Sequence, residues 1–426
     1  MTAREYPRLG ETIYKSVLPN GLTVAVVPRS GFSRKLAYFV TDFGAVHTHF
    51  TMDGVPYAAP AGVAHYLEHK LFDMPGGRDV TAEFAALGAT PNAFTSYDMT
   101  AYFFTCTENF RECLHLLLEF VSTPYFTEET VAKEQGIIGQ EIGMNEDSPD
   151  TVVFENMMRL MYRNHPIQEP ILGTRETIAE ITDQVLRDCH RAFYRPGNMI
   201  LCVVGDVDPK EVEEIALDVL PKTDETQVIR AGNWPEDMTC PGTYQAEEME
   251  VSMPMFQLGF KCEPIGTGDD AIRQEIIGDL AAEALFGESS QLYLKLYEEG
   301  IIDSSFGGGF ETIDGMAMLS CSGDSDEPEA VRDAILEQGA ILAKTGIAES
   351  DFQRIKRSAM GRRIRDLDSF SSTCFRICAY HFSDFDYFRF PEIYEQVECR
   401  EIQEFLSRVI TAPRCSLSIV EPTKEV

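Results

Sequence analysis

The sequence of 426 residues lacks a long apolar run. No segment reaches the roughly 18 uninterrupted apolar residues of a membrane-spanning helix, so we expect no membrane span. The opening stretch, MTAREYPRLGETIYKSVLPNGL, has neither an apolar core nor a small-residue cleavage site, and we expect no secretory signal. With 44% hydrophobic and 25% charged residues, the composition is that of an ordinary soluble globular protein.

Positive charge is scarce. The chain has 36 Lys and Arg residues against 69 Asp and Glu residues, which gives a formal net charge of −33 at pH 7. Such a chain repels the phosphates of nucleic acids and anionic membrane surfaces, so we expect neither as a partner. The acidic excess permits cationic partners such as basic peptides, although it can also serve solubility alone.

The eleven cysteines are odd in number and scattered, and none forms a CxxC pair. We therefore expect no disulfide framework, and this cysteine usage suits a reducing cytoplasm. The G-x-S-x-G turn of serine hydrolases and the phosphate-binding loop of nucleotide enzymes are also absent. These absences argue against the enzyme classes that depend on those motifs.

The length favours two domains of about 200 residues each. A polar stretch rich in Pro and Gly lies at about 221–250, and the order strand, apolar helix, strand pair, helices, strand occurs on both sides of it. We predict an α+β fold of two homologous halves, each a mainly antiparallel sheet with helices packed on it, related by an approximate two-fold duplication. The predicted ranges are a domain at 1–225, a linker at 226–250 and a second domain at 251–426.

The stretch GVAHYLEHKLF at residues 62–72 carries two histidines within a helical apolar pattern. His65 and His69 are four residues apart, so a helix presents both imidazoles on one face, and Glu68 can point to the same side. The pattern fits either a core helix with polar intruders or one wall of a metal site. A catalytic zinc usually takes three protein ligands and keeps a fourth position for water, so a third ligand must come from elsewhere.

The segment FTEETVAKEQGIIGQEIGMNEDSPD is predicted to form a long helix that offers this ligand. Glu134 and Glu141 are seven residues apart and therefore share a helix face. They interrupt an apolar pattern, and burying acidic side chains there would be costly without a cation. In the second half, the corresponding apolar helix carries no histidine, so we expect metal chemistry in the first half alone.

These motifs resemble those of a known family. H-x-x-E-H is the inverted zinc motif, and the sequence resembles the pitrilysin/insulinase family of zinc metallopeptidases, in the half-length bacterial branch related to the mitochondrial processing peptidases. The resemblance covers most of the first 210 residues and, more loosely, the second half. It rests on HYLEHKLF, EQGIIGQE, NAFTS at 92–96, EDSPD at 146–150, HPI and ILGT within 165–174, and FYRPGNMIL at 193–201.

The resemblance implies a role for each matching residue. It implies one zinc ion per chain, a general base next to it, an acidic residue that orients the site, and an edge strand that pairs with an extended peptide. It also implies that peptides or small unfolded polypeptides are cleaved inside a clamshell chamber. The zinc ligands would be His65, His69 and Glu141, the base Glu68, the orienting acid Glu134, and the edge strand Asn92, Ala93 and Phe94.

The sequence departs from the family in its second half. Active members usually carry an arginine there, followed seven residues later by a tyrosine, but Ala317 and Asp324 hold these positions. We therefore expect a heterodimer with a related chain that lacks the zinc motif, with a homodimer as the alternative. Two functions remain open: a zinc endopeptidase, and a zinc-retaining but catalytically incomplete subunit that binds peptides or acts as a scaffold.

Overall fold

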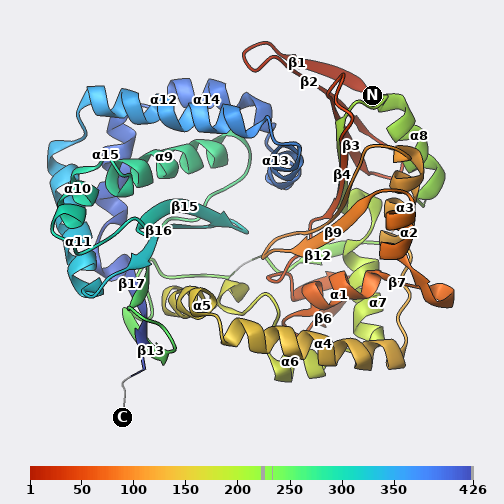
Figure 1. The fold of residues 1–426 in the computed structure, drawn as a ribbon, viewed down its shortest axis with the longest axis horizontal. Helices are drawn as coiled ribbons and strands as arrows, with labels where there is room; N and C mark the ends of the chain where they lie inside the picture. Colours follow the sequence, from red (N-terminus) through yellow and green to blue (C-terminus); the bar gives the residue numbers. More distant parts are fainter. Residues whose placement is uncertain (222–225, 233, 424–426) are drawn as a thin grey trace. The chain divides into compact units, whose positions relative to one another are not determined.

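The computed structural model describes residues 1–221, 226–232 and 234–423 (Figure 1). Helices and open sheets alternate along the chain, which confirms the α+β prediction. The chain divides into two compact units. Unit 1 consists of Met1–Ile142, Glu169–Asn233 and Ile364–Phe388, and unit 2 consists of Gly143–Gln168, Trp234–Arg363 and Arg389–Val426.

Unit 1 is built on a seven-stranded sheet in which one neighbouring pair, β3 and β11, is parallel and the others are antiparallel. The segment Pro19-Asn20-Gly21 lies between β2 and β3, and β9 forms one edge of the sheet. The strand order is β1 (Thr2–Tyr6), β2 (Glu11–Val17), β3 (Thr23–Pro28), β11 (Met199–Gly205), β4 (Lys35–Thr41), β10 (Thr100–Cys106) and β9 (Thr90–Thr95).

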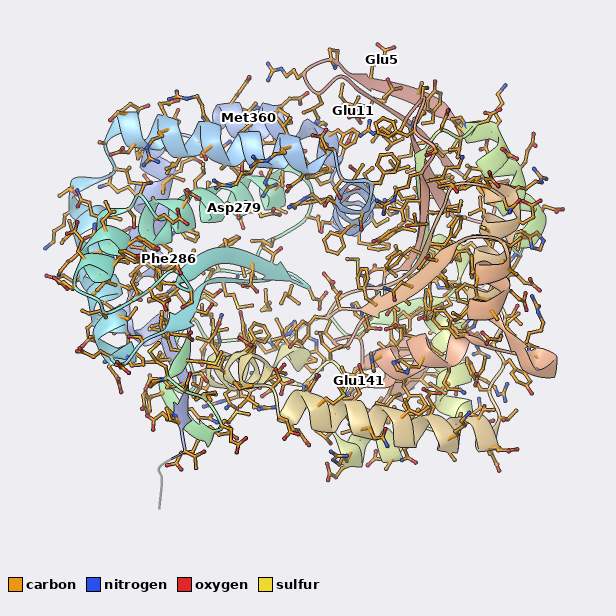
Figure 2. All side chains as sticks on the ribbon, in the orientation of Figure 1. Glu5, Glu11, Glu141, Asp279, Phe286 and Met360 are labelled. Carbon is orange, nitrogen blue, oxygen red and sulfur yellow. The ribbon has the colours of Figure 1, made fainter. Side chains whose placement is uncertain are left out.

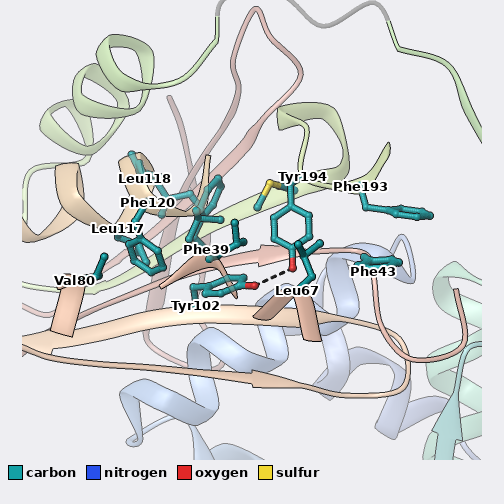
Figure 3. Packing of buried hydrophobic residues seen from close by; sticks show 14 of the residues in the cluster. Phe39, Phe43, Leu67, Val80, Tyr102, Leu117, Leu118, Phe120, Phe193 and Tyr194 are labelled. Carbon is teal, nitrogen blue, oxygen red and sulfur yellow. Dashed lines mark hydrogen bonds between the residues drawn. The ribbon is translucent and has the colours of Figure 1, made fainter. Parts of the chain in front are cut away.

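Helices cover both faces of this sheet because side chains alternate between the faces along each strand. Phe39 and Tyr102 point into a core that also contains Leu67 of helix α1 (Val63–Leu71), as Figure 3 shows. On the opposite face, the hydroxyl of Tyr38 lies 2.8 Å from that of Ser371 on another helix. The helices of unit 1 are α1, α2 (Val80–Ala86), α3 (Phe110–Val121), most of α4 (Glu128–Glu146), α6 (Arg175–Ala179), α7 (Asp183–Phe193), α8 (Pro209–Val219) and α13 (Phe370–Phe382).

Two smaller sheets complete unit 1. One has the order β12 (Val228–Arg230), β5 (His49–Met52) and β6 (Val55–Ala58). The other pairs the two short strands β7 (Asp73–Met74) and β8 (Arg78–Asp79) directly after α1.

Unit 2 repeats the strand arrangement of unit 1. Its sheet has the order β13 (Tyr244–Met249), β17 (Cys415–Pro422), β14 (Met255–Lys261), β16 (Met316–Asp324) and β15 (Gly307–Ile313). The pair β13 and β17 is parallel and the remaining pairs are antiparallel, as in β3-β11-β4-β10-β9. The shared order and directions confirm the predicted duplication of the fold.

The helices of unit 2 include α9, which takes the place that α1 has in unit 1 and contains no histidine. These helices are α5 (Pro149–Met161), α9 (Gly268–Phe286), α10 (Gln291–Glu298), α11 (Pro328–Thr345), α12 (Glu349–Asp366, up to Arg363), α14 (Phe390–Gln396) and α15 (Cys399–Val409). Among all helices that the structure describes, none combines the length and the apolar composition needed to cross a membrane.

Helices α5 and α13 each belong to a different unit from the segments that precede and follow them in sequence. Helix α5 packs on β14 and β17 of unit 2, and α13 packs on β11 and β4 of unit 1. The units are therefore discontinuous, unlike the predicted ranges 1–225 and 251–426, and the predicted linker at 226–250 contains β12 and β13. The domain ranges stay a prediction, and residues 222–225, 233 and 424–426 lie outside the described residues.

Candidate metal centre

Contacts at the N-terminal end of helix α1 and along the side that faces α4 hold the helix in place. It follows Gly62, whose φ of 89° lies in the left-handed region. A Cβ at this position would lie 2.3 Å from the carbonyl oxygen of Leu172, so the close approach of the two backbones requires glycine. The hydroxyl of Tyr66 donates a hydrogen bond to the carbonyl of Val131, which ties α1 to α4.

Lys70 adds a second tie between α1 and α4. Its side chain is fully buried, and the ammonium group donates to the carbonyl of Thr130 at 3.2 Å and pairs with Asp73. A buried ammonium needs such partners because its desolvation is otherwise costly. The two ties place the following turns of α4, with Glu134 and Glu141, beside the histidines of α1.

His65, His69 and Glu141 converge at this contact. Nε2 of His65 lies 3.7 Å from Oε1 of Glu141, and Nε2 of His69 lies 3.6 Å from Oε2. One ligand atom from each of the three residues lies within 4.8 Å of those of the other two, and Figure 2 labels Glu141 on α4. These distances are long for hydrogen bonds but close to the separation of about 3.4 Å expected for two ligands of one tetrahedral zinc ion.

Glu134 orients one of the rings. Its Oε1 lies 3.0 Å from Nδ1 of His69, so Nδ1–H can donate to the carboxylate while Nε2 faces Glu141. A carboxylate behind a ligating histidine is a common arrangement at zinc sites. Nδ1 of His65 is buried and has no hydrogen-bond partner among the described residues. Two imidazoles and one carboxylate form a donor set that fits a zinc ion and leaves a fourth position for solvent.

The two histidines differ in their protonation. Burial lowers the pKa of His65 to about 3, and the nearby charge of His69 adds to this effect, so the ring is neutral and able to ligate. Burial by itself lowers the pKa of His69, but the hydrogen bond to Glu134 and the charges of Glu68, Glu134 and Glu141 raise it above its ordinary value. A metal ion must therefore displace a proton from His69.

Glu68 is buried next to the two histidines. Burial raises the pKa of its carboxyl group, and a hydrogen bond from Thr95 opposes this rise. Oγ1 of Thr95 donates to Oε2 of Glu68 at 2.7 Å. A carboxylate with a raised pKa beside a metal site has the properties of a general base.

Thr95 was not singled out by the sequence analysis, although it lies within the NAFTS stretch. In the sheet, Thr95 is opposite Thr100 and so faces the same side as Tyr102, toward α1. Strand alternation could have predicted this face, but the distance to Glu68 depends on how the sheet packs against α1.

The residues predicted to bind substrate lie on strand β9. Asn92, Ala93 and Phe94 pair with β10 on one side, and β9 has no strand partner on its other side among the described residues. The ring of Phe94 lies 6.0 Å from that of Phe375 on α13. The strand is therefore an edge strand, as expected, while the binding role of these residues stays a prediction.

Comparison with known protein families covers most of the chain. Residues 57–175 match the family model described as Insulinase (Peptidase family M16), and residues 180–359 match the model of the Peptidase M16 inactive domain. The zinc protease YmfH of Bacillus subtilis, which is described as uncharacterized, is 35% identical over 98% of both chains. The chain belongs to peptidase family M16. The predicted resemblance to the pitrilysin/insulinase family is confirmed, and the first matched region contains the whole candidate metal centre.

Three further proteins are similar to the chain in sequence or in fold. The uncharacterized zinc protease YmxG of Bacillus subtilis is 25% identical, with 73% of this chain and 76% of YmxG covered. A crystal structure of an M16-like protein from Alicyclobacillus acidocaldarius has a TM-score of 0.93 and 29% identity, and covers 99% of this chain and 100% of that one. The periplasmic protease PqqL of Escherichia coli shares the fold, with a TM-score of 0.74 at 17% identity, and this chain spans 48% of it.

Proposed function

We propose that this chain is the zinc-bearing subunit of a metalloendopeptidase that cleaves peptides or small unfolded polypeptides. The observation that supports this function best is the convergence of His65, His69 and Glu141 next to the buried carboxyl group of Glu68. Family membership and the zinc protease names of the relatives support it independently. The single cluster of this kind among the described residues supports one zinc ion per chain.

The chain's own residues supply the remaining parts of the chemistry. Nε2 of His65, Nε2 of His69 and the carboxylate of Glu141 would hold the metal, and Glu134 keeps the ring of His69 oriented. A zinc ion bound there supplies Lewis acidity for the scissile carbonyl and the attacking water. Glu68 accepts the proton of that water on its carboxylate and returns it to the leaving amine. Its raised pKa brings it closer to neutral pH, where a base of this kind is most effective.

The substrate is an extended peptide in this proposal. The free edge of β9 at Asn92, Ala93 and Phe94 can add the peptide as a further strand, which recognises main chain and leaves side-chain choice to other surfaces. The net charge of −33 favours cationic peptides. All eleven cysteines are free thiols, which supports a cytoplasmic location.

A second chain belongs to the proposed enzyme. This chain corresponds to about half of the longer PqqL, and it lacks the arginine and tyrosine expected in its second half. The positions that would hold them, Ala317 and Asp324, lie on β16. A related chain without the zinc motif would supply the missing pair, and a homodimer is the alternative. The closed chamber stays a prediction from the family resemblance.

The test of the proposed activity is the substitution Glu68→Gln. The variant should bind zinc as wild type does, because Glu68 is not a ligand. Its kcat should fall by about 100-fold to 10,000-fold, because the general base is removed. Elemental analysis measures the zinc, and cleavage of a mixed peptide pool with and without a chelator measures the activity. Glu129→Gln, at an exposed position in the first turn of α4, is the matched control.

Three outcomes would contradict the proposal. A Glu68→Gln variant that cleaves peptides at the wild-type rate would remove Glu68 from the mechanism. Wild-type cleavage that a chelator leaves unchanged would remove the metal. A protein that binds zinc and peptides but cleaves nothing, even with its partner chain, would instead be the peptide-binding or scaffold subunit.

A further inference from the structure

We infer that Thr95 is a positioning residue that couples the pairing of a peptide with β9 to the orientation of the Glu68 carboxylate. This inference rests on the proposed function, because it assigns Thr95 a task only if Glu68 is the base. It concerns a hydrogen bond between the edge strand and helix α1, two elements with separate tasks in the proposed mechanism.

The hydrogen bond from Thr95 to Glu68 has a defined direction. A hydroxyl group carries one proton, and Oγ1 of Thr95 directs it to Oε2 of Glu68 at 2.7 Å. The neighbouring hydroxyl of Thr100 donates to the carbonyl of Phe43 at 2.8 Å and lies 3.5 Å from Oγ1 of Thr95. The proton of Thr100 is therefore already used, and Thr95 is left as the donor to the carboxylate.

This bond determines which oxygen of Glu68 can act. Oε2 is occupied by Thr95, whereas Oε1 accepts no hydrogen bond from any residue that the structure describes. The last torsion of a glutamate side chain is soft, so helix α1 alone does not fix the plane of the carboxylate. A short hydrogen bond to an ionised oxygen fixes it and leaves Oε1 for the reacting water.

The position of Thr95 on β9 links this bond to substrate binding. Thr95 follows Phe94 directly, and the two side chains point to opposite faces of the strand. Among the residues that the structure describes, β9 pairs with β10 on one side and with no strand on the other. A peptide that pairs with the free edge at Asn92–Phe94 would hold the strand from both sides and restrict the motion of Thr95 as well. Main-chain contacts away from the scissile bond would then increase kcat and not only lower KM.

The test compares three threonine variants in the assembled enzyme. Thr95→Val keeps the shape but removes the donor, Thr95→Ser keeps the donor, and Thr105→Val makes the same change on β10 away from Glu68. Thr95→Val should lower kcat by about 10-fold to 100-fold, the range expected for one hydrogen bond to a charged group, with KM within about twofold. Thr95→Ser should stay within about threefold of wild type, and Thr105→Val should be unchanged.

Peptides of increasing length test the coupling itself. In wild type, kcat should rise once the peptide is long enough to cover Asn92–Phe94. In Thr95→Val, kcat should be almost independent of length, while KM still improves with each added residue. A rise in kcat with length that is equal in both proteins overturns the coupling.

Two readouts do not depend on turnover. The zinc affinity of Thr95→Val, measured by competition with a chromogenic chelator, should lie within about twofold of wild type, because Thr95 is not a ligand. In the inactive Glu68→Gln protein, adding Thr95→Val should leave the binding of a fluorescent peptide unchanged. Loss of peptide binding there would make Thr95 a binding residue and overturn the inference.

The outcomes separate this inference from the proposed function. Full kcat in Thr95→Val, or no recovery in Thr95→Ser, overturns the positioning role while the peptidase assignment stands. Absence of zinc-dependent cleavage in wild type overturns both.

Discussion

A proton and a zinc ion compete for the imidazole ring of His69. Its Nδ1 contacts Glu134 and its Nε2 faces Glu141. Because the pKa of His69 is raised in the folded, metal-free protein, the protonated ring stabilises that state. This stabilisation is fully present below the ordinary value of 6.5 and is lost as the pH rises through the raised pKa. Zinc binding expels the proton, so the metal gains affinity as the pH rises.

The apparent zinc affinity of wild type should therefore rise by about tenfold per pH unit below the raised pKa of His69 and level off above it. In Glu134→Gln, the hydrogen bond to a carboxylate and one of the three charges that raise the pKa of His69 are removed, so the plateau should begin at a lower pH. The plateau affinity should also fall by about 10-fold to 100-fold, because the carboxylate behind the ligand is lost. Chelator competition from pH 5.5 to 8.5 measures both effects, with the exposed Glu128→Gln as control. An unchanged profile in Glu134→Gln would contradict the role of this contact.

Helix α1 carries the two histidines and Glu68, so its position determines the geometry of the site. That position depends on Gly62, where the backbone is left-handed and lies against the carbonyl of Leu172. Strand β9 contributes the hydrogen bond from Thr95, and α4 contributes Glu134 and Glu141. The site is therefore sensitive to small displacements between these three elements.

Gly62→Ala should destabilise the metal-free protein by about 2–4 kcal/mol, from the left-handed backbone and the contact with Leu172. It should also weaken zinc binding, because α1 must shift away from the loop. Gly136→Ala is the matched control, since Gly136 is exposed within α4 and a Cβ there meets nothing within 4 Å. That change should stabilise the helix by about 0.5–1 kcal/mol. Urea unfolding gives the stability of both variants, and zinc titration gives their zinc affinity. A Gly62→Ala protein as stable as the Gly136→Ala protein would argue against the role of Gly62.

The chain as a whole has the strand arrangement twice, but histidines in the α1 position only once. One half therefore carries the candidate metal centre, and the other lacks both a metal motif and the arginine and tyrosine expected there. This asymmetry is the reason to expect a second chain in the active enzyme.

We predict that the purified chain binds one zinc ion but cleaves peptides slowly, and that a related chain without the zinc motif restores activity. Native mass spectrometry gives the metal content and the oligomeric state, and peptide cleavage by each chain alone and by the mixture gives the activity. A zinc-site variant, His65→Ala, in the mixture is the negative control. Full activity of this chain as a homodimer would replace the heterodimer, and full activity as a monomer would contradict both.

Local spacing allowed much of the site to be predicted. Residues four and seven apart on a helix share a face whatever surrounds them, so His65 with His69, and Glu134 with Glu141, could each be paired in advance. The duplicated α+β fold is confirmed, and the structure brings His65, His69 and Glu141 together and places β9 at the edge of its sheet. The catalytic and binding roles of the individual residues stay predictions.

The sequence by itself determined which residues could form the metal centre, because helical and strand periodicity are local and hold without knowledge of the fold. Only the tertiary structure decided that Thr95 reaches Glu68, that Glu134 contacts His69 while Glu141 faces both rings, and that α5 and α13 pack with units distant from them in sequence. These contacts join residues that lie 27 to more than 150 positions apart in sequence. They are set by how buried surfaces pack against each other, and no repeating spacing in the chain encodes that packing.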